Sequence, residues 1–193
     1  MIILNKKLLI TTILLTIIYI ISFFQKETNF IMPENNVIDY NYNFIDIEYE
    51  GKHLKINIDD YIIGVVAAEM PASFHEEALK AQSIASRTYL INTMSINETV
   101  ETTTNSQVYI DETKMIEKWG DDYQTYYNKI KSIVRETSRK IITYQNQPIK
   151  AFYHSMSNGY TDSSLNVFNE QYDYLNVTES KWDQDNSQTI SIS

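Results

Sequence analysis

The stretch that decides the fold is residues 59–94, DDYIIGVVAAEMPASFHEEALKAQSIASRTYLINTM. It begins with an almost wholly apolar run over 61–68 that ends on one acid, Glu69. Met70-Pro71 follows, and because proline has no N–H to continue a helix, the pattern predicts a helix that stops there. A carboxylate at the end of an apolar run is costly to desolvate. We therefore expect Glu69 either to be paired or to serve in chemistry.

A second helix is expected from residue 74 to residue 94, because this segment contains no glycine or proline. Ser73 precedes it and Glu76 follows three residues later, which is the spacing of an N-terminal capping box. Small residues recur along one face and predict a close contact with another element: Ala78, Ala81, Ala85 and Thr88. The whole stretch thus predicts a helix–break–helix with an acid at the corner.

The segments around this core predict an α+β fold in which β-hairpins pack on the helix–break–helix. Residues 44–58 alternate apolar and polar side chains and predict a hairpin, with His53 on its solvent-facing side. Residues 140–153 predict a second hairpin, which delivers His154 to a polar loop. Residues 107–110 predict a short strand.

Two further helices are expected, at residues 112–120 and 123–137. The second carries an apolar stripe that predicts a core-facing side: Tyr126, Tyr127, Ile130, Ile133 and Val134. These helices and the two hairpins place the folded domain at residues 44–193, while the polar segment 27–43 is expected to be a linker.

The N-terminus predicts a membrane anchor within residues 1–26. Residues 8–24, LLITTILLTIIYIISFF, contain no charge and follow Lys6-Lys7. This run is just long enough to span a bilayer, and the lysine pair favours a cytoplasmic N-terminus with the domain outside. A cleaved signal peptide is the alternative interpretation, although no small-x-small cleavage site follows the run.

Charge and cysteine content exclude several classes of function. The chain carries a formal net charge of −9, and three of its 16 basic residues, Lys6, Lys7 and Lys26, precede the first acid. Such an acidic outer part argues against nucleic acid and anionic lipid as main partners. The chain has no cysteine and its three histidines show no metal-ligand spacing, so we predict no disulfide, no metal and no cofactor.

Residues 62–89, IIGVVAAEMPASFHEEALKAQSIASRTY, resemble the core motif of the stage II sporulation protein D family, which is similar to the amidase-enhancer wall proteins. Two more segments resemble the same family in the expected order, SQVY at 106–109 and AFYHSMSNGYT at 151–161. Two departures accompany the resemblance. Phe168-Asn169 stands where the family commonly shows Trp-Gly, and family members usually continue beyond the position of Ser193, which predicts a chain that is short at its C-terminus.

The resemblance implies a peptidoglycan lytic transglycosylase with Glu69 as the catalytic residue. Its expected reaction cleaves MurNAc–GlcNAc bonds in peptide-stripped glycan strands and leaves 1,6-anhydroMurNAc ends during engulfment in sporulation. A hydrolase needs a second carboxylate. In a transglycosylase the C6 hydroxyl attacks its own C1, so one carboxyl group can act as acid and then as base. The implied partners are an amidase, the stage II sporulation protein P, and a membrane scaffold at the engulfing septum.

The predicted substrate-binding residues are Lys80, Arg87, Gln107, Tyr109, Tyr153, His154, Ser155, Ser157 and Thr161. Arg87 and Lys80 would hold a lactyl carboxylate or acetamide group through charge-assisted hydrogen bonds, and Tyr153 would stack on a sugar face. Three alternatives stay open. In the first, Glu69 pairs with Arg87 and holds the two helices together. In the second the chain is a non-catalytic wall-binding enhancer of an amidase, and in the third it is a truncated, inactive member.

Overall fold

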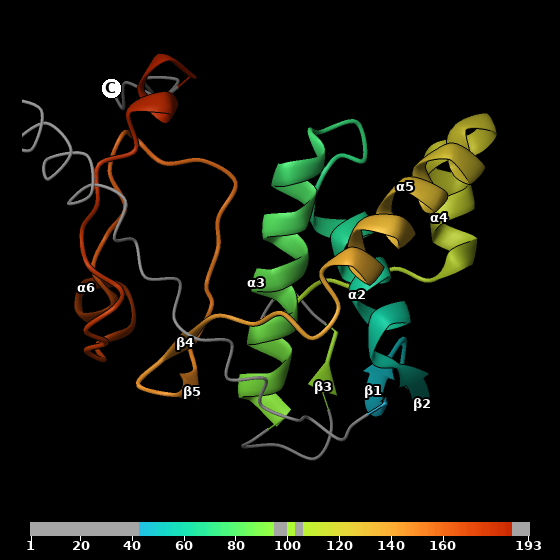
Figure 1. The fold of residues 1–193 in the computed structure, drawn as a ribbon, viewed down its shortest axis with the longest axis horizontal. Coiled ribbons are helices and arrows are strands. Elements are labelled where there is room, and N and C mark those ends of the chain that lie inside the picture. Colours follow the sequence, from blue (N-terminus) through green and yellow to red (C-terminus); the bar gives the residue numbers. More distant parts are fainter. Residues whose placement is uncertain (1–42, 95–99, 103–105, 187–193) are drawn as a thin grey trace, which may run out of the picture. The chain divides into compact units, whose positions relative to one another are not determined.

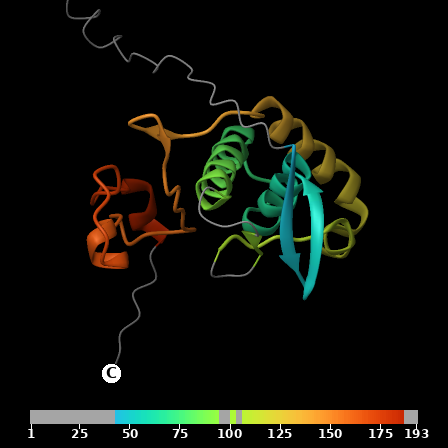
Figure 2. The same cartoon turned by 90° about the horizontal axis from the view of Figure 1, so that it is seen from below.

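The computed structural model describes residues 43–94, 100–102 and 106–186 (Figure 1). Three helices form its centre: α2 (Ile58–Glu69), α3 (Glu76–Met94) and α5 (Tyr123–Glu136). Each of the three contacts the other two, and the three lie close together in both ribbon views (Figures 1 and 2). No helix within the described ranges is long and apolar enough to cross a membrane. The predicted anchor at residues 8–24 lies outside those ranges.

Two strands of a small three-stranded sheet precede the helices, and its third strand follows α3. Strands β1 (Phe44–Tyr49) and β2 (Lys52–Asn57) are antiparallel, and the two-residue strand β3 (Val100–Glu101) pairs parallel with β1. The β1–β2 turn has positive φ at both central residues, 52° at Glu50 and 73° at Gly51, as the tightest hairpin turns require. The predicted first hairpin is confirmed and His53 is exposed, as expected.

Helix α2 follows β2 directly because Asn57 caps it, accepting the Asp59 N–H at 2.9 Å through its side-chain oxygen. Every residue from 61 to 67 is buried, so the helix is covered on all sides. It ends at Glu69, and Met70 takes an extended conformation (φ −131°, ψ 139°) before Pro71. The predicted helix and its break at Met70-Pro71 are confirmed.

The start of α3 differs from the prediction. Residues 71–74 form a turn in which the Phe74 N–H donates to the Pro71 carbonyl at 3.0 Å, so the helix cannot begin at residue 74. His75 caps it instead, and its Nδ1 accepts the Glu77 N–H at 3.3 Å. The expected capping box on Ser73 is therefore wrong.

The face that α3 buries also differs. Of the small residues predicted to make a close contact, Thr88 is buried, but Ala81 is exposed and Ala78 and Ala85 are half-buried. The buried face follows the two leucines, Leu79 and Leu90, which lose far more apolar surface to the core than an alanine can.

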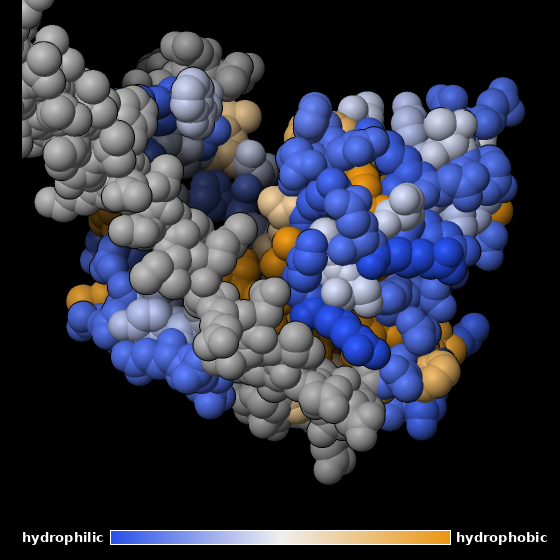
Figure 3. Space-filling view, viewed as in Figure 1, coloured by the Kyte–Doolittle hydropathy of each residue, from blue (hydrophilic) through white to orange (hydrophobic). Residues whose placement is uncertain are grey.

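The second half of the domain alternates short elements with loops: α4 (Glu112–Trp119), the 3-10 turn η1 (Gly120–Asp122), α5, β4 (Thr143–Tyr144), β5 (Gln147–Pro148), α6 (Ser164–Phe168) and the 3-10 turn η2 (Lys181–Asn186). The two helices that we predicted are confirmed. The second hairpin is confirmed in place, but it spans residues 143–148 and is shorter than the predicted 140–153. On α5, Ile130, Ile133 and Val134 are buried, while hydrophilic side chains cover most of the face that α4 and α5 present in Figure 3. The predicted strand at 107–110 is wrong, because this segment packs on α2 without pairing to a strand.

Candidate functional site

Glu69 is the last residue of α2, and its side chain is exposed. Its Oε1 accepts the backbone N–H of Val108 at 3.0 Å. No basic side chain within the described ranges forms an ion pair with it. The carboxylate is thus held in place by one neutral donor and remains open to the solvent.

The C-terminal end of α2 carries its own partial negative charge, which disfavours a carboxylate. Lys118 of α4 offsets this charge. Its ammonium donates to the Ala67 carbonyl at 2.7 Å and to the Ala68 carbonyl at 3.3 Å. A positive charge therefore lies beside the last turn of the helix, next to the residue that carries the acid.

The donor to Glu69 is positioned by the aromatic residue that follows it. Tyr109 is buried, stacks on Tyr61 (centroids 5.5 Å apart, interplanar angle 9°) and meets Tyr49 edge-on. It approaches α2 at Gly64, where an added Cβ would lie 2.2 Å from the ring of Tyr109. Glycine is therefore required inside this helix, despite its cost in helix propensity, so that Val108 can reach Glu69.

Tyr153 joins the same site from the loop after β5. Gln107 is buried, and its Nε2 donates to the Tyr153 hydroxyl at 3.2 Å. Burial raises the pKa of Tyr153, and the nearby charge of Glu69 raises it further. Hydrogen bonds with Gln107, Ser86 and Gln82 act in the opposite direction on this pKa. Tyr153 thus carries a neutral hydroxyl, and its pKa is affected by the charge of Glu69.

Two hollows adjoin these residues. The first has a volume of about 450 Å³ and is lined by Ala68, Glu69, Met70, Pro71, Ala72, Ser73, Lys118, Trp119 and Tyr126. The second, of about 460 Å³, is lined by Phe152, Tyr153, His154, Thr161, Asp162, Ser163, Ser164, Val167, Phe168, Tyr174, Leu175, Asn176 and Thr178. Three of the predicted ligand residues, Tyr153, His154 and Thr161, therefore share one hollow, and Glu69 lines the other.

The structure places Arg87 at the opposite end of α2 from Glu69. Its guanidinium is buried and donates to Asp59 Oδ1 at 3.2 Å and to the Thr137 carbonyl at 2.8 Å. Asp59 and Glu69 are ten residues apart in one helix, which is about 15 Å along its axis. The alternative in which Glu69 pairs with Arg87 is therefore wrong.

Lys80 is likewise engaged away from Glu69. Its ammonium pairs with Glu136 Oε1 at 2.8 Å and with Glu77 Oε1 at 3.0 Å. Both acids raise the pKa of Lys80 through these hydrogen bonds. The structure thus gives Lys80 a place in a surface network between α3 and α5, where exposed pairs contribute little stability.

Two of the remaining candidates, Ser157 and Thr161, form hydrogen bonds within the protein. The Ser157 N–H and Oγ both donate to Asp183 Oδ2, at 3.0 and 2.6 Å. The Thr161 Oγ1 donates to the Asn176 carbonyl and accepts the Thr178 N–H. Ser155 is exposed on the loop, and the ring of Tyr109 belongs to the core.

Four residues at these positions were not among the predicted site residues: Gln82, Ser86, Trp119 and Tyr126. Gln82 and Ser86 lie four apart on α3, and the Gln82 Nε2 donates to the Ser86 Oγ at 3.1 Å. Two polar residues one helical turn apart within a buried face are the signal that could have found them. Trp119 and Tyr126 come from separate helices, and no local spacing links them to Glu69.

The part of the chain that the structure describes contains no group of three or more His, Asp or Glu side chains placed to hold a metal ion.

The fold and site together define an α+β domain that presents one exposed carboxylate at the corner of a helix–break–helix. Residues 50–144 match the family model described as Stage II sporulation protein. Through this domain, the chain belongs to the stage II sporulation protein D family.

The similar proteins include two named stage II sporulation protein D. The one from Bacillus subtilis (strain 168) is 42% identical over 137 residues, which cover 67% of this chain and 40% of the relative. The one from Bacillus amyloliquefaciens is 39% identical over the same length. The amidase enhancer of Bacillus subtilis (strain 168) is 35% identical over 130 residues, or 16% of its length. The chain therefore spans about 40% of the length of the sporulation proteins it matches.

Proposed function

We propose that this protein is a peptidoglycan lytic transglycosylase with Glu69 as its catalytic residue. The substrate would be peptide-stripped glycan, cleaved at MurNAc–GlcNAc bonds. One observation carries the proposal: Glu69 is an exposed carboxylate fixed by the Val108 N–H at 3.0 Å at the edge of a hollow. Membership of the stage II sporulation protein D family supports it.

The reaction needs one group that gives and then takes a proton. The protonated Glu69 carboxyl would donate its proton to the glycosidic oxygen as the bond from C1 of MurNAc breaks. The carboxylate would then accept the proton of the MurNAc C6 hydroxyl as that oxygen bonds to C1. The products are a free 4-hydroxyl on GlcNAc and a 1,6-anhydro ring on MurNAc, and no water is consumed.

The surroundings of Glu69 suit this chemistry better than hydrolysis. Among the residues that line its hollow, Glu69 is the one carboxylate. A hydrolase would place a second carboxylate within several ångströms of the scissile bond, as nucleophile or as base for water. The backbone donor at Val108 orients one oxygen of Glu69, which leaves the other to face substrate.

The Tyr153 hydroxyl is the second element of the proposal. It is held by Gln107 and lies within the electrostatic reach of Glu69. Because its raised pKa keeps it neutral, it can donate a hydrogen bond to a glycan hydroxyl or acetamide oxygen. We propose Tyr153 and His154 as substrate-positioning residues on the hollow that they share.

The setting of the reaction is also a proposal. The apolar run at residues 8–24 would anchor the chain in the cell membrane, with the domain outside at the engulfing septum. An amidase that strips stem peptides, of the stage II sporulation protein P type, would act before this enzyme. An acidic domain suits a glycan that has lost its charged peptides.

A second candidate function is non-catalytic stimulation of an amidase. The 35% identity to the relative named amidase enhancer favours it. An enhancer would bind wall glycan and raise amidase turnover without cleaving the strand itself. It would not depend on the carboxyl chemistry of Glu69.

The deciding experiment uses residues 1–193 in mild detergent, as wild type and as Glu69→Gln, with peptide-stripped glycan strands and mass spectrometry. We expect products lighter by one water than hydrolysis products from wild type and none from Glu69→Gln. Glu117→Gln, which neutralises another exposed carboxylate, is the matched control and should cleave like wild type. If folded wild-type protein leaves the strands intact but still raises amidase turnover, the proposal of a transglycosylase is refuted and the enhancer function is favoured.

A further inference from the structure

The hollow beside Glu69 has an aromatic wall that the proposed chemistry leaves unused. Trp119, from the end of α4, meets Tyr126 of α5 with ring centroids 5.8 Å apart and planes at 68°. Trp119 also lies nearly parallel to Tyr123, at 6.4 Å and 26°. Trp119 and Tyr126 are half-buried, so part of each ring surface remains open to the hollow.

The chain holds Trp119 in place with a sharp turn. The next residue, Gly120, has φ 53° and ψ −124°, a conformation that side-chain-bearing residues rarely adopt. Its N–H donates to the Ile116 carbonyl and closes α4. The backbone that carries the indole is therefore fixed at the end of a helix. The indole itself packs on the rings of Tyr123 and Tyr126, which limits the entropy that a ligand must remove.

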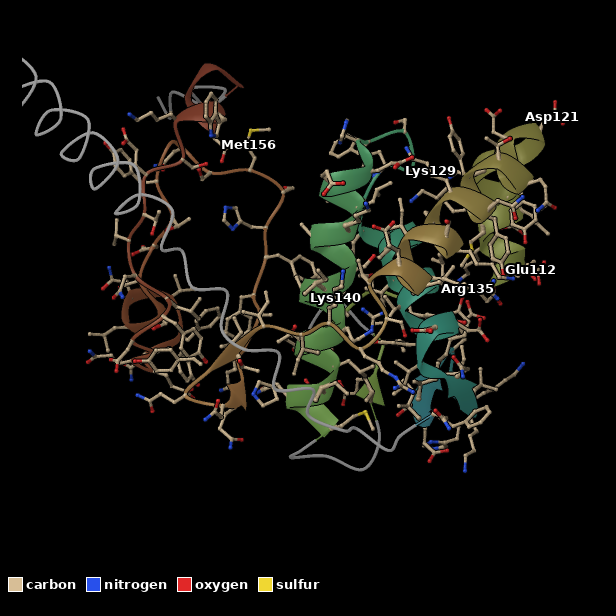
Figure 4. All side chains as sticks on the ribbon, viewed as in Figure 1. Glu112, Asp121, Lys129, Arg135, Lys140 and Met156 are labelled. Atoms are coloured by element: carbon tan, nitrogen blue, oxygen red, sulfur yellow. The ribbon has the colours of Figure 1, made fainter. Side chains whose placement is uncertain are left out.

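The opposite side of the hollow is fixed as well. Lys129, labelled in Figure 4, extends from α5 to the loop between α2 and α3. Its ammonium donates to the Ala72 carbonyl at 2.9 Å and to the Phe74 carbonyl at 2.6 Å. The loop that faces the aromatic wall is thus tied to the helix that carries Tyr126.

Polar groups lie at the rim of this hollow. Lys118 donates to two carbonyls of α2 and keeps a third N–H, because an ammonium has three. The Ser73 hydroxyl and the Glu69 carboxylate complete the rim. An aromatic wall with a few convergent donors and acceptors matches a sugar ring, which has an apolar face and hydroxyl or acetamide edges.

We propose that Trp119 and Tyr126 form a carbohydrate subsite that binds one N-acetylhexosamine ring of a β-1,4-linked glycan next to Glu69. This inference rests on the proposed function, since it names how the same site holds its substrate. The sugar face packs on the indole, the Lys118 ammonium donates to the acetamide carbonyl, and the ring thereby fixes the neighbouring glycosidic oxygen near Glu69.

The chain contains two tryptophans, which makes the test specific. Trp182 is 87% exposed and lines neither hollow. In the variant Trp182→Phe, all tryptophan fluorescence comes from Trp119. We expect a saturable blue shift of this emission when chitotetraose is added to residues 1–193 in mild detergent, because a stacked sugar removes water from the indole.

A second variant measures the contribution of the ring. Trp119→Leu should weaken chitotetraose binding about tenfold by calorimetry, the order expected for losing one stacked aromatic face. Trp182→Leu is the matched control and should bind like wild type. Circular dichroism of each variant checks that the fold is retained. The reporter variant Trp182→Phe leaves the hollow unchanged, because Trp182 does not line it. An emission that does not respond, or equal affinity in a folded Trp119→Leu, overturns the subsite.

The subsite and the catalytic proposal fail separately. If wild type cleaves glycan strands but the Trp119 emission does not respond to sugar, the catalytic role of Glu69 is supported and the subsite is refuted. If the Trp119 emission responds saturably but the strands stay intact, the subsite is supported and the transglycosylase activity is refuted. Glu69→Gln should bind chitotetraose and not cleave, which is the expected pattern if both hold.

Discussion

Replacing Arg87 with alanine separates a structural role from a ligand role. Family resemblance implies that Arg87 contacts substrate. Yet Arg87 is only 3% exposed, and its guanidinium faces α5 and the start of α2. Burial lowers the pKa of Arg87, and Asp59 raises it again by charge and hydrogen bonding. A cation in this place fastens three elements together, and its burial keeps it away from a glycan.

The expected loss of stability follows from these contacts. Removing one partner of a buried ion pair typically costs about 3–5 kcal/mol. Two features reduce the cost here. The side chain of Asp59 is 34% exposed and can be hydrated, and the Thr137 carbonyl keeps a second donor in the Lys140 N–H at 3.1 Å. We therefore expect Arg87→Ala to lose about 3 kcal/mol, a large part of a typical folding free energy.

The assay is urea unfolding followed by circular dichroism at constant pH, on wild type, Arg87→Ala and Lys80→Ala. Lys80 is the matched control, since its ion pairs are exposed and its removal should shift the urea midpoint much less. The affinity of folded Arg87→Ala for chitotetraose should equal that of wild type. An unchanged urea midpoint together with lost affinity would refute the structural role and restore Arg87 as a ligand.

Three further changes have defined outcomes. Gly64→Ala should lose about 1–3 kcal/mol in urea unfolding, because its Cβ meets the ring of Tyr109 at 2.2 Å and this strain exceeds the helix-propensity gain; wild-type stability would contradict the close approach. Burial raises the pKa of Tyr109 to about 12, and that of Tyr61 further. In the unfolded chain these two tyrosines lose their protons near pH 10, so the urea midpoint should be constant below about pH 10 and fall above it. As a check, the ultraviolet absorbance of phenolate should show these two tyrosines ionising at a higher pH in the folded protein than in the unfolded one. Asn169→Gly should be tolerated while Asn169→Val loses about 1–2 kcal/mol, since Asn169 lies at φ 56°; equal stability of the two variants would argue against this conformation.

Local patterns predicted the elements well because their causes are local. Pro71 set the predicted end of α2 through its missing N–H, an effect that acts within a few residues. The first hairpin followed from alternation around Gly51. Chemistry of this kind is readable without knowing what lies across the core.

The site was only partly predictable because its parts meet through tertiary packing. Glu69 was found from its position after an apolar run, but its exposure depends on where the loop after α2 turns. Arg87 illustrates the limit most clearly. Its partners at Asp59 and Thr137 are 28 and 50 residues away in sequence, so its burial was invisible in any local pattern. The resemblance implied a substrate-binding role for Arg87, whereas the structure places its guanidinium in an ion pair with Asp59.

The departure at Phe168-Asn169 shows how packing decides whether a substitution matters. Phe168 stacks on Phe152 with centroids 4.3 Å apart and lines the hollow that Tyr153 shares, so an aromatic side chain fills the place of the family's tryptophan. Asn169 ends α6 in the left-handed conformation, and its N–H donates to the Leu165 carbonyl. Asparagine is among the residues that best tolerate this conformation after glycine. Each residue therefore keeps the physical property that its position needs, and this pair gives no reason to expect the hollow to be lost.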